Sequence, residues 1–205
     1  MSAYDGTALL DRVAFVGMGV GTLAAYGEPG RRMDFYEIDP AVVDIARTDF
    51  DFLRDAEGEV RVVEGDGRLQ LREAGQGTYG LVVLDAFSSD AIPVHLLTEE
   101  AVGEYRRVLR PHGLLAFHVT NRHLDLVPVL AAEAQRLGMT AVVRRDLGAA
   151  PPASVSTWVV LARAPGDLAR LRTRPGWVEA ENRSDVRAWT DDYSSLVEVL
   201  DLGWE

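Results

Sequence analysis

Three glycines stand at alternate positions directly after the apolar run 13–16, where the segment GMGVGT carries Gly17, Gly19 and Gly21. Glycine in a turn permits a positive φ and lets a ligand approach the backbone closely. A nucleotide could therefore lie against this turn. The dinucleotide fingerprint needs glycine or alanine where Thr22 stands, so the motif for NAD is incomplete. We expect a strand, a tight turn and the start of a helix, with an ordinary strand-to-helix connection as the alternative.

Acidic side chains follow the next two apolar runs. Glu37 ends the run 33–37, at the spacing of about 20 residues from the first glycine at which a carboxylate contacts ribose hydroxyls. Such a carboxylate accepts both hydroxyl protons and repels a 2′-phosphate, which argues against NADP. Asp66 stands between two glycines after the third run, where it could accept a hydrogen bond from an adenine amino group. Their neighbours Ile38 and Gly67, with Asp85 after the fourth apolar run, complete the predicted nucleoside site.

A second group of polar residues follows the fourth apolar run. Asp85 ends that run, and the loop beyond it contains Ser88, Ser89 and Asp90. A positioned carboxylate can remove a proton from an attacking group, which is typically worth about 10²–10⁴-fold in rate. A carboxylate at a strand end can instead cap a helix or form a turn. Two carboxylates and two hydroxyls in one loop favour catalysis, so we expect Asp85 and Asp90 to be catalytic and the loop to bind substrate.

His118 and Asn121 are the remaining candidates for contact with substrate, since both lie at the end of the fifth apolar run. A core histidine satisfied by the backbone is an equally good interpretation of His118. The chain has four histidines and no cysteine. Because the histidines lack the H-x-x-x-H and H-E-x-x-H spacings, we expect no metal site.

Strands must position these residues, because each group of candidates follows an apolar run. The runs alternate with helical patterns, which favours a mostly parallel sheet with helices on both faces. Asp39 and Thr98 should cap helices at their N-termini, and Gly138 should end a third helix. The stretch 144–156 has no helical pattern, so the last strand should be an antiparallel edge strand. The seven expected strands are 12–16, 33–37, 60–63, 81–84, 114–119, 141–143 and 157–162.

The sequence predicts one α/β catalytic domain over residues 1–164 with a Rossmann-like sheet. Residues 165–205 are polar and contain tryptophan, and we expect them to form a helical extension packed on that domain. Within the extension, Asp191 and Asp192 precede a helical run, so they are interpreted as caps of a final helix. The alternative is that they fold over the mouth of the substrate site.

Composition excludes several classes of function. The 205-residue chain has a formal net charge of −11 and a pI of about 4.8, and it lacks a basic patch, so nucleic acid is not an expected partner. It contains no apolar run of about 18 residues and no signal-peptide pattern, so we expect no membrane partner and a cytoplasmic location. All 21 basic residues are arginine, which excludes lysine Schiff-base chemistry.

The combination of a glycine turn and carboxylates at successive strand ends resembles the class I S-adenosylmethionine-dependent transferases over about residues 10–163. Five further segments resemble the spermidine synthase-like branch of the polyamine aminopropyltransferases. These segments are YEIDP, GDGR, LDAFSSDAIPVHLLT, GLLAFHVTNRHLDL and WTDDYSSLVEVL. The resemblance implies a donor sulfonium, either S-adenosylmethionine or its decarboxylated form, a small-molecule amine acceptor, no metal, and a chain that could form a homodimer.

The same resemblance assigns roles to individual residues. Asp85 would be the general base, Asp90 would hold the polyamine, Glu37 would bind ribose and Asp66 adenine. Two features depart from the family pattern. Val20 replaces the aspartate of the family's GGGDGG turn, and only about 11 residues precede the first strand, where the family has a β-rich domain.

Three functions therefore stay open. The first is a spermidine synthase-like transfer of an alkyl group, aminopropyl in that family, to an amine. The second is methyl transfer from S-adenosylmethionine to a small molecule, which the valine in GMGVGT favours. The third is a nucleoside-binding subunit without catalysis.

Overall fold

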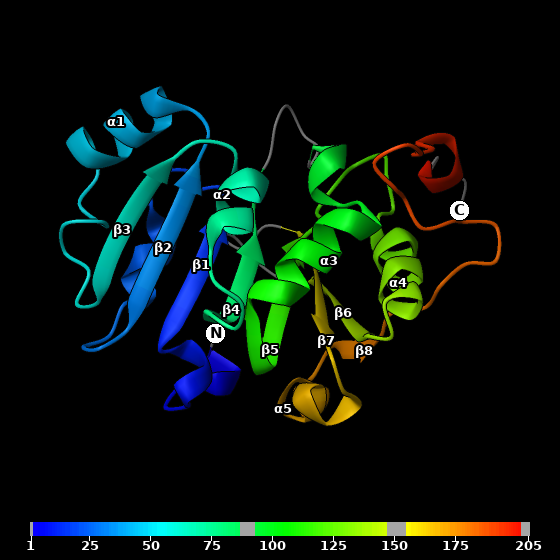
Figure 1. Ribbon diagram of the computed structural model, residues 1–205. Coiled ribbons are helices and arrows are strands. Elements are labelled where there is room, and N and C mark those ends of the chain that lie inside the picture. The colour runs from blue at the N-terminus through cyan, green and yellow to red at the C-terminus, as the bar shows by residue number, and fades with distance from the viewer. Residues whose placement is uncertain (1, 87–92, 147–154, 202–205) are drawn as a thin grey trace. The chain divides into compact units, whose positions relative to one another are not determined.

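The computed structural model describes residues 2–86, 93–146 and 155–201. Within them, eight strands follow the order β3-β2-β1-β4-β5-β7-β6-β8 in a sheet (Figure 1). The strands are β1 Arg12–Val16, β2 Arg32–Glu37, β3 Glu59–Glu64, β4 Tyr79–Leu84, β5 Leu109–His118, β6 Thr140–Asp146, β7 Ser156–Ala162 and β8 Trp177–Glu179. The α-helices are α1 Pro40–Thr48, α2 Gly67–Glu73, α3 Glu99–Val108, α4 Val127–Arg136 and α5 Ala169–Arg172.

The predicted α/β fold is confirmed, with one correction to the number of strands. Strand β1 pairs in parallel with β2 and β4, and β2 pairs in parallel with β3. Strand β6 pairs antiparallel with β7, as expected, and also with β8, so the sheet has eight strands and not seven. The strand predicted to lie at the edge, β7, is an inner strand between β5 and β6, and β8 lies at the edge instead. Strand β8 is only three residues long and two of its three residues are exposed, so no apolar alternation marked it in the sequence.

The chain divides into two compact units. The first comprises Met1–Ala86 with Glu104–Leu115, and the second comprises Phe87–Gly103 with Ala116–Glu205. The proposed boundary between residues 164 and 165 does not coincide with this division and stays a prediction.

The core of the first unit surrounds strand β1, which has β2 on one side and β4 on the other. Val13, Ala14 and Phe15 are fully buried because apolar residues cover both faces of a central parallel strand. The rings of Phe15 and Phe35, which are partners in the β1–β2 register, stack with centroids 4.6 Å apart. This rigid central strand leads directly into the glycine turn.

The structure confirms the residues predicted to begin or end three of the helices. The Asp39 carboxylate accepts from the N–H of Ala41 at the start of α1, and the Thr98 hydroxyl accepts from the N–H of Ala101 in α3. Gly138 follows α4 with a φ of 63°, the left-handed conformation that commonly ends a helix.

The interpretation of Asp191 as a helix cap is wrong. Its carboxylate accepts from the Thr98 hydroxyl at 2.7 Å, and its N–H donates to the Glu100 carboxylate at 3.0 Å. The following described segment forms only a short 3₁₀ helix, Val197–Val199, whose N-cap is Leu196. Asp191 therefore attaches the C-terminal segment to the start of α3 inside the second unit.

Candidate nucleoside-binding site

The parallel ladder of the first unit brings the predicted nucleoside residues to one edge of the sheet. The N–H of Gly17 donates to Tyr36 O at 2.9 Å, and the N–H of Asp85 donates to Val16 O at 2.8 Å. The N–H of Gly65 likewise donates to Glu37 O at 2.8 Å. Because these bonds continue the strand register, β1, β2, β3 and β4 all end at the same level, which is where open α/β sheets bind ligands.

The glycine turn has the backbone conformation that the sequence predicted. Gly17, Gly19 and Gly21 have φ values of 89°, 53° and 83°, which L-residues with a side chain rarely adopt. A Cβ on Gly17 would lie 2.4 Å from the carbonyl oxygen of Asp85, and one on Gly21 would lie 2.9 Å from Leu53 Cδ2. The turn therefore packs against both the end of β4 and the loop after α1. The helix expected next is only a 3₁₀ helix, Thr22–Tyr26.

The carboxylate of Glu37 connects the glycine turn to the end of β2. Its Oε2 accepts from the backbone N–H of Met18 at 3.0 Å, and its Oε1 accepts from the N–H of Asp39 at 3.0 Å. The residue is 9% exposed. Since each carboxylate oxygen can accept more than one hydrogen bond, both backbone contacts are compatible with bonds from ribose hydroxyls. Sequence reasoning selected Glu37 but missed its contact with Met18.

Asp66 and Gly67 shape the start of helix α2. The Asp66 Oδ1 accepts from the N–H of Leu69 at 2.9 Å, so the residue is the N-cap of α2. A Cβ on Gly67 would lie 2.5 Å from Val16 Cγ1. The absence of a side chain at Gly67 therefore lets α2 approach β1. The capping role of Asp66 was not predicted, and its contact with adenine stays a prediction.

Ile38 and Asp85 are the remaining predicted site residues that the structure describes at this edge of the sheet. The Ile38 side chain is 67% exposed and therefore accessible, and its contact with the nucleoside stays a prediction. Asp85 directly follows β4 and lies against Gly17. Ser88, Ser89 and Asp90 lie outside the described residues, so the predicted pairing of Asp85 with Asp90 stays a prediction.

The other two predicted substrate residues lie in the second unit. His118 ends β5, and its ring nitrogen Nε2 is 2.7 Å from the Thr120 hydroxyl. The Asn121 Oδ1 accepts from the N–H groups of His123 and Leu124 at 2.8 and 2.9 Å. Asn121 therefore holds a turn through its own side chain, and its contact with substrate stays a prediction.

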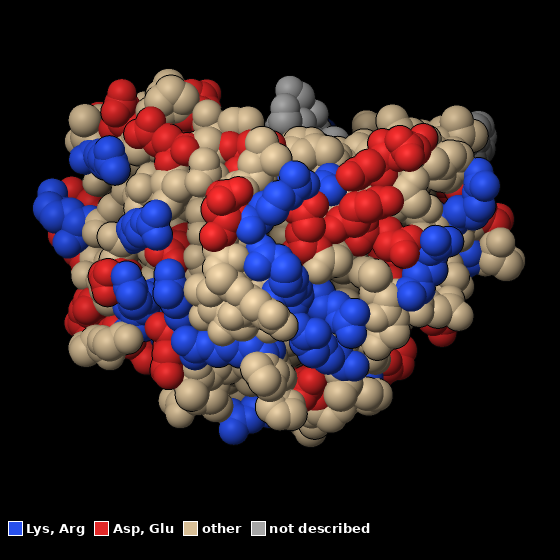
Figure 2. Space-filling view, viewed as in Figure 1, with Lys and Arg blue, Asp and Glu red and all other residues tan. Residues whose placement is uncertain are grey.

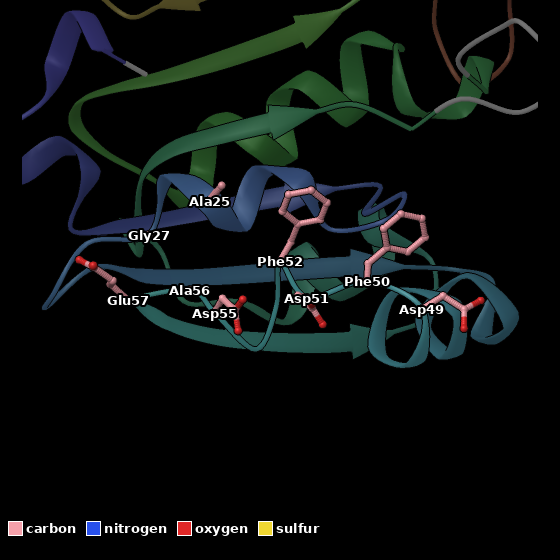
Figure 3. Close-up of a pocket in the computed structure, with 9 residues that line it drawn as sticks. All are labelled: Ala25, Gly27, Asp49, Phe50, Asp51, Phe52, Asp55, Ala56 and Glu57. Carbon is pink, nitrogen blue, oxygen red and sulfur yellow. The ribbon is translucent and has the colours of Figure 1, made fainter.

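A separate pocket of about 710 Å³ occupies another part of the first unit (Figure 3). The rings of Phe50 and Phe52 stack there with centroids 6.3 Å apart, and Arg54 forms ion pairs with Asp51 and Asp55. No predicted site residue lines it, and no motif in the sequence pointed to it. The lining residues are Ala25, Gly27, Asp49, Phe50, Asp51, Phe52, Asp55, Ala56 and Glu57.

Acidic side chains and arginines are interspersed over the face shown in Figure 2. In the part of the chain that the structure describes, no group of three or more His, Asp or Glu residues could hold a metal ion. The same residues include no helix with the length and apolarity needed to cross a membrane.

Comparisons with known proteins agree with the geometry. No family model matches the chain. The polyamine aminopropyltransferase of Vibrio vulnificus (strain CMCP6) is 37% identical over 110 residues, which are 51% of this chain and 36% of that protein. The chain thus spans about a third of the length of this relative.

Two solved structures show the fold. A probable spermidine synthase from Corynebacterium glutamicum ATCC 13032 has a TM-score of 0.64 at 19% identity, over 90% of this chain and 74% of that one. Human Methyltransferase-like protein 13, solved in complex with SAH, has a TM-score of 0.57 at 18% identity, over 86% and 90%.

The strand order, the glycine turn and these likenesses define a class I S-adenosylmethionine-dependent transferase fold. Over 110 residues the chain is also similar in sequence to a polyamine aminopropyltransferase. The resemblance that the sequence motifs predicted is therefore confirmed.

Proposed function

We propose that the chain is a transferase that binds an S-adenosyl sulfonium at the glycine turn and transfers an alkyl group, aminopropyl in the first instance, to an amine. The observation that carries this proposal is the contact between Gly17 and Asp85 together with the bond from Met18 to Glu37. These contacts hold the carboxylate of Glu37, for which we propose ribose binding, and the backbone of the candidate base Asp85 at one end of the same turn. The Vibrio vulnificus relative supports the choice of aminopropyl transfer to a small amine.

The proposed reaction balances without a further reactant. The neutral amine nitrogen attacks a carbon bonded to the sulfonium sulfur, so a C–N bond forms and a C–S bond breaks. The electron pair of the C–S bond stays on sulfur, which leaves as a neutral thioether. Asp85 accepts the proton that the new ammonium group must lose, and passes it to solvent. The carboxylate also favours the approach of cationic groups electrostatically.

Binding geometry supplies the rest of the proposed rate gain. Holding the acceptor and the sulfonium within attack distance can contribute as much as about 7–11 kcal/mol to lowering the barrier. The buried strands β1 and β4 fix the backbone positions of Gly17 and Asp85 before either substrate binds. We infer that this end of the sheet is rigid enough for such positioning, because both residues continue a hydrogen-bonded ladder.

Methyl transfer is the second candidate. Val20 occupies the glycine turn where the aminopropyltransferase pattern has an acid, and Methyltransferase-like protein 13 has a similar fold. Both reactions use an S-adenosyl sulfonium and the same kind of proton acceptor. They differ in which carbon on sulfur is attacked, so the group found on the amine product decides between them.

Calorimetry with three ligands tests the proposal. S-adenosylmethionine, decarboxylated S-adenosylmethionine and methylthioadenosine should be titrated into the wild-type chain and into Asp85→Asn. We expect tight binding of the decarboxylated donor to both proteins, and a loss of transfer rate of about 10²–10⁴-fold in Asp85→Asn. The matched control Asp39→Asn changes an exposed cap and should keep the wild-type rate.

Each other outcome has a defined meaning. Absence of nucleoside binding would overturn the whole proposal. Binding and transfer with S-adenosylmethionine alone would replace aminopropyl transfer by methyl transfer. Good binding without alkylation of any amine by either donor would identify a nucleoside-binding subunit. A wild-type rate in Asp85→Asn would remove Asp85 from the mechanism.

A further inference from the structure

A cavity of about 240 Å³ lies within the first unit, and none of the described residues of the candidate nucleoside site lines it. Its lining comes from strands β1 to β4, from helix α2 and from the turn that follows α2. Its volume is below the roughly 300–1,000 Å³ of pockets for drug-sized molecules, so a ligand that fills it must be small. The lining residues are Arg12, Tyr36, Arg61, Val63, Gln70, Glu73, Ala74, Gly75, Thr78 and Tyr79.

Two tyrosines form the buried part of this lining. Tyr36 and Tyr79 are 5% and 1% exposed. The Tyr79 hydroxyl donates to Asp34 Oδ2 at 2.7 Å, so its single proton is already used. In the contact of 2.6 Å between the two hydroxyls, Tyr36 must therefore be the donor. Since neither hydroxyl has a further proton to donate, both oxygens can only accept from a ligand, which suits an ammonium group and not a carboxylate.

The more exposed part of the lining carries charges of both signs. The Arg12 guanidinium is already engaged, because it donates to Asp34 Oδ2 at 3.0 Å and lies over the Tyr79 ring. Arg61 and Glu73 are exposed at the cavity. In residues 2–86, 93–146 and 155–201, neither of these two side chains forms an ion pair or a hydrogen bond, with the other or with a third residue. A guanidinium and a carboxylate thus line one small cavity without pairing.

We propose that this cavity binds a small zwitterion with one carboxylate and one ammonium group, which is the chemistry of an amino acid. Arg61 donates to the ligand carboxylate, a pairing that a guanidinium can make with two parallel hydrogen bonds. Glu73 and the tyrosine oxygens accept from the ammonium group. The site is separate from the proposed nucleoside site, so the inference does not depend on the proposed function.

Ligands with a single charge fit the lining less well. A carboxylate alone pairs with Arg61, but it is repelled by Glu73 and finds no hydroxyl proton on the tyrosines. An ammonium group alone pairs with Glu73, but it is repelled by Arg61. A zwitterion pairs with both side chains, so the cavity should prefer it to either of its halves.

NMR titration of the nitrogen-15-labelled full chain at pH 7 tests this preference. Glycine, 3-aminopropanoate, 4-aminobutanoate and 5-aminopentanoate carry the same two charges at increasing separation. We expect one of them to shift the amide signals of residues 70–79 saturably. It should bind about 10-fold more tightly than the matched carboxylate without the amine and the matched amine without the carboxylate, the effect of one charge-assisted hydrogen bond. For 5-aminopentanoate these matched ions are pentanoate and butylamine.

Two variants assign the charges to residues. Arg61→Gln should remove the preference for the zwitterion over the matched amine, and Glu73→Gln should remove its preference over the matched carboxylate. Both side chains are exposed, so the fold should stay intact in both variants. Arg47→Gln in α1 and Glu64→Gln at the end of β3 also remove exposed charges, but neither residue lines the cavity. These control variants should keep the wild-type preference.

The other outcomes would overturn the inference. Equal affinity for the zwitterion and the matched carboxylate would indicate an anion site, and equal affinity for the zwitterion and the amine would indicate a cation site. Absence of a saturable shift with every probe, or shifts outside the cavity lining, would show that no such site exists. An unchanged preference in both Arg61→Gln and Glu73→Gln would remove these residues from recognition. None of these results depends on donor binding at the glycine turn, which calorimetry tests separately.

Discussion

Glu37 and Met18 are 19 residues apart in the sequence and are joined by a hydrogen bond of 3.0 Å from the Met18 N–H to the Glu37 Oε2. The bond runs from the glycine turn after β1 to the carboxylate that ends β2. A residue expected to bind ribose thus also holds the turn on which the nucleoside would lie. Preorganisation of this kind lowers the cost of binding, because the turn is ordered before the ligand arrives.

Replacement of Glu37 should therefore affect stability and binding together. Glu37→Gln leaves one carbonyl oxygen for two backbone donors, so we expect the free energy of unfolding to fall by about 1–3 kcal/mol. Donor binding should weaken by roughly 10–100-fold, since charge-assisted bonds to ribose are lost. Urea unfolding and calorimetry measure the two effects. Glu64→Gln, at the exposed end of β3 in register with Glu37, should show neither; equal effects in both variants would contradict the assignment.

The contact of Gly17 with Asp85 leads to a prediction about two similar glycines. Gly17→Ala places a Cβ 2.4 Å from a backbone carbonyl oxygen at positive φ, so strain and displacement together should cost about 2–4 kcal/mol. Gly19→Ala has positive φ but no atom within 4 Å of its Cβ, so it should cost only about 1–2 kcal/mol. Urea unfolding compares them. Equal destabilisation would show that Asp85 moves freely and that the close packing has no energetic role.

A buried tyrosine network in the first unit should make the protein sensitive to alkali. The Tyr79 hydroxyl donates to Asp34 Oδ2 at 2.7 Å and is 2.6 Å from the Tyr36 hydroxyl. Burial, then the bonds to Tyr36 and Asp34, raise the pKa of Tyr79 well above its ordinary value of 10.0. Stability from a raised pKa is intact below the ordinary value and is lost as pH rises above it. We therefore expect the unfolding free energy to fall between pH 10 and 11.

Tyr79→Phe tests that expectation by urea unfolding at pH 8 and pH 11. At pH 8 the variant should be less stable by about 1–3 kcal/mol, because Asp34 loses a donor in a buried site. Between the two pH values it should lose less stability than the wild type does. Tyr26→Phe, which changes a tyrosine that is 52% exposed, is the control. An identical alkaline loss in Tyr79→Phe and the wild type would contradict the prediction.

Glu133 in the second unit should destabilise the protein at neutral pH. The residue is fully buried in α4. Burial, followed by the charges of Glu99 and Glu100, raises its pKa well above the ordinary 4.5, while the backbone of Trp189 opposes the shift. A carboxyl group with a raised pKa contributes stability below its ordinary pKa and loses that contribution as pH rises.

Glu133→Gln keeps the shape of the side chain and removes its ionisation. We expect the variant to be more stable than the wild type at pH 8 by about 1–3 kcal/mol, with the difference shrinking toward pH 5. Urea unfolding across that range measures it, with Glu73→Gln in the exposed part of α2 as the control. A difference that is the same at pH 5 and pH 8 would show that Glu133 does not titrate differently in the folded chain.

The sequence identified the parts of the site that follow from local chain order. Gly17, Glu37 and Asp85 each stand at the end of an apolar run, and parallel strands necessarily place their carboxyl ends at one edge. The caps Asp39 and Thr98 were predictable for the same reason, since a cap and its partner lie within three residues of each other.

Only the tertiary structure decided contacts between residues that are distant in sequence. Asp191 accepts a hydrogen bond from Thr98, which lies 93 positions away, and β8 joins the sheet by pairing with β6. The sequence pattern of neither segment indicates which residues it contacts. Thr120 likewise meets the backbone of Thr157 across 37 positions. Sequence periodicity and capping preferences indicate interactions between residues that are close in the chain. Contacts between distant segments depend instead on how the sheet packs. The sequence therefore predicted where the strands end, and only the tertiary structure showed which residues lie beside those ends.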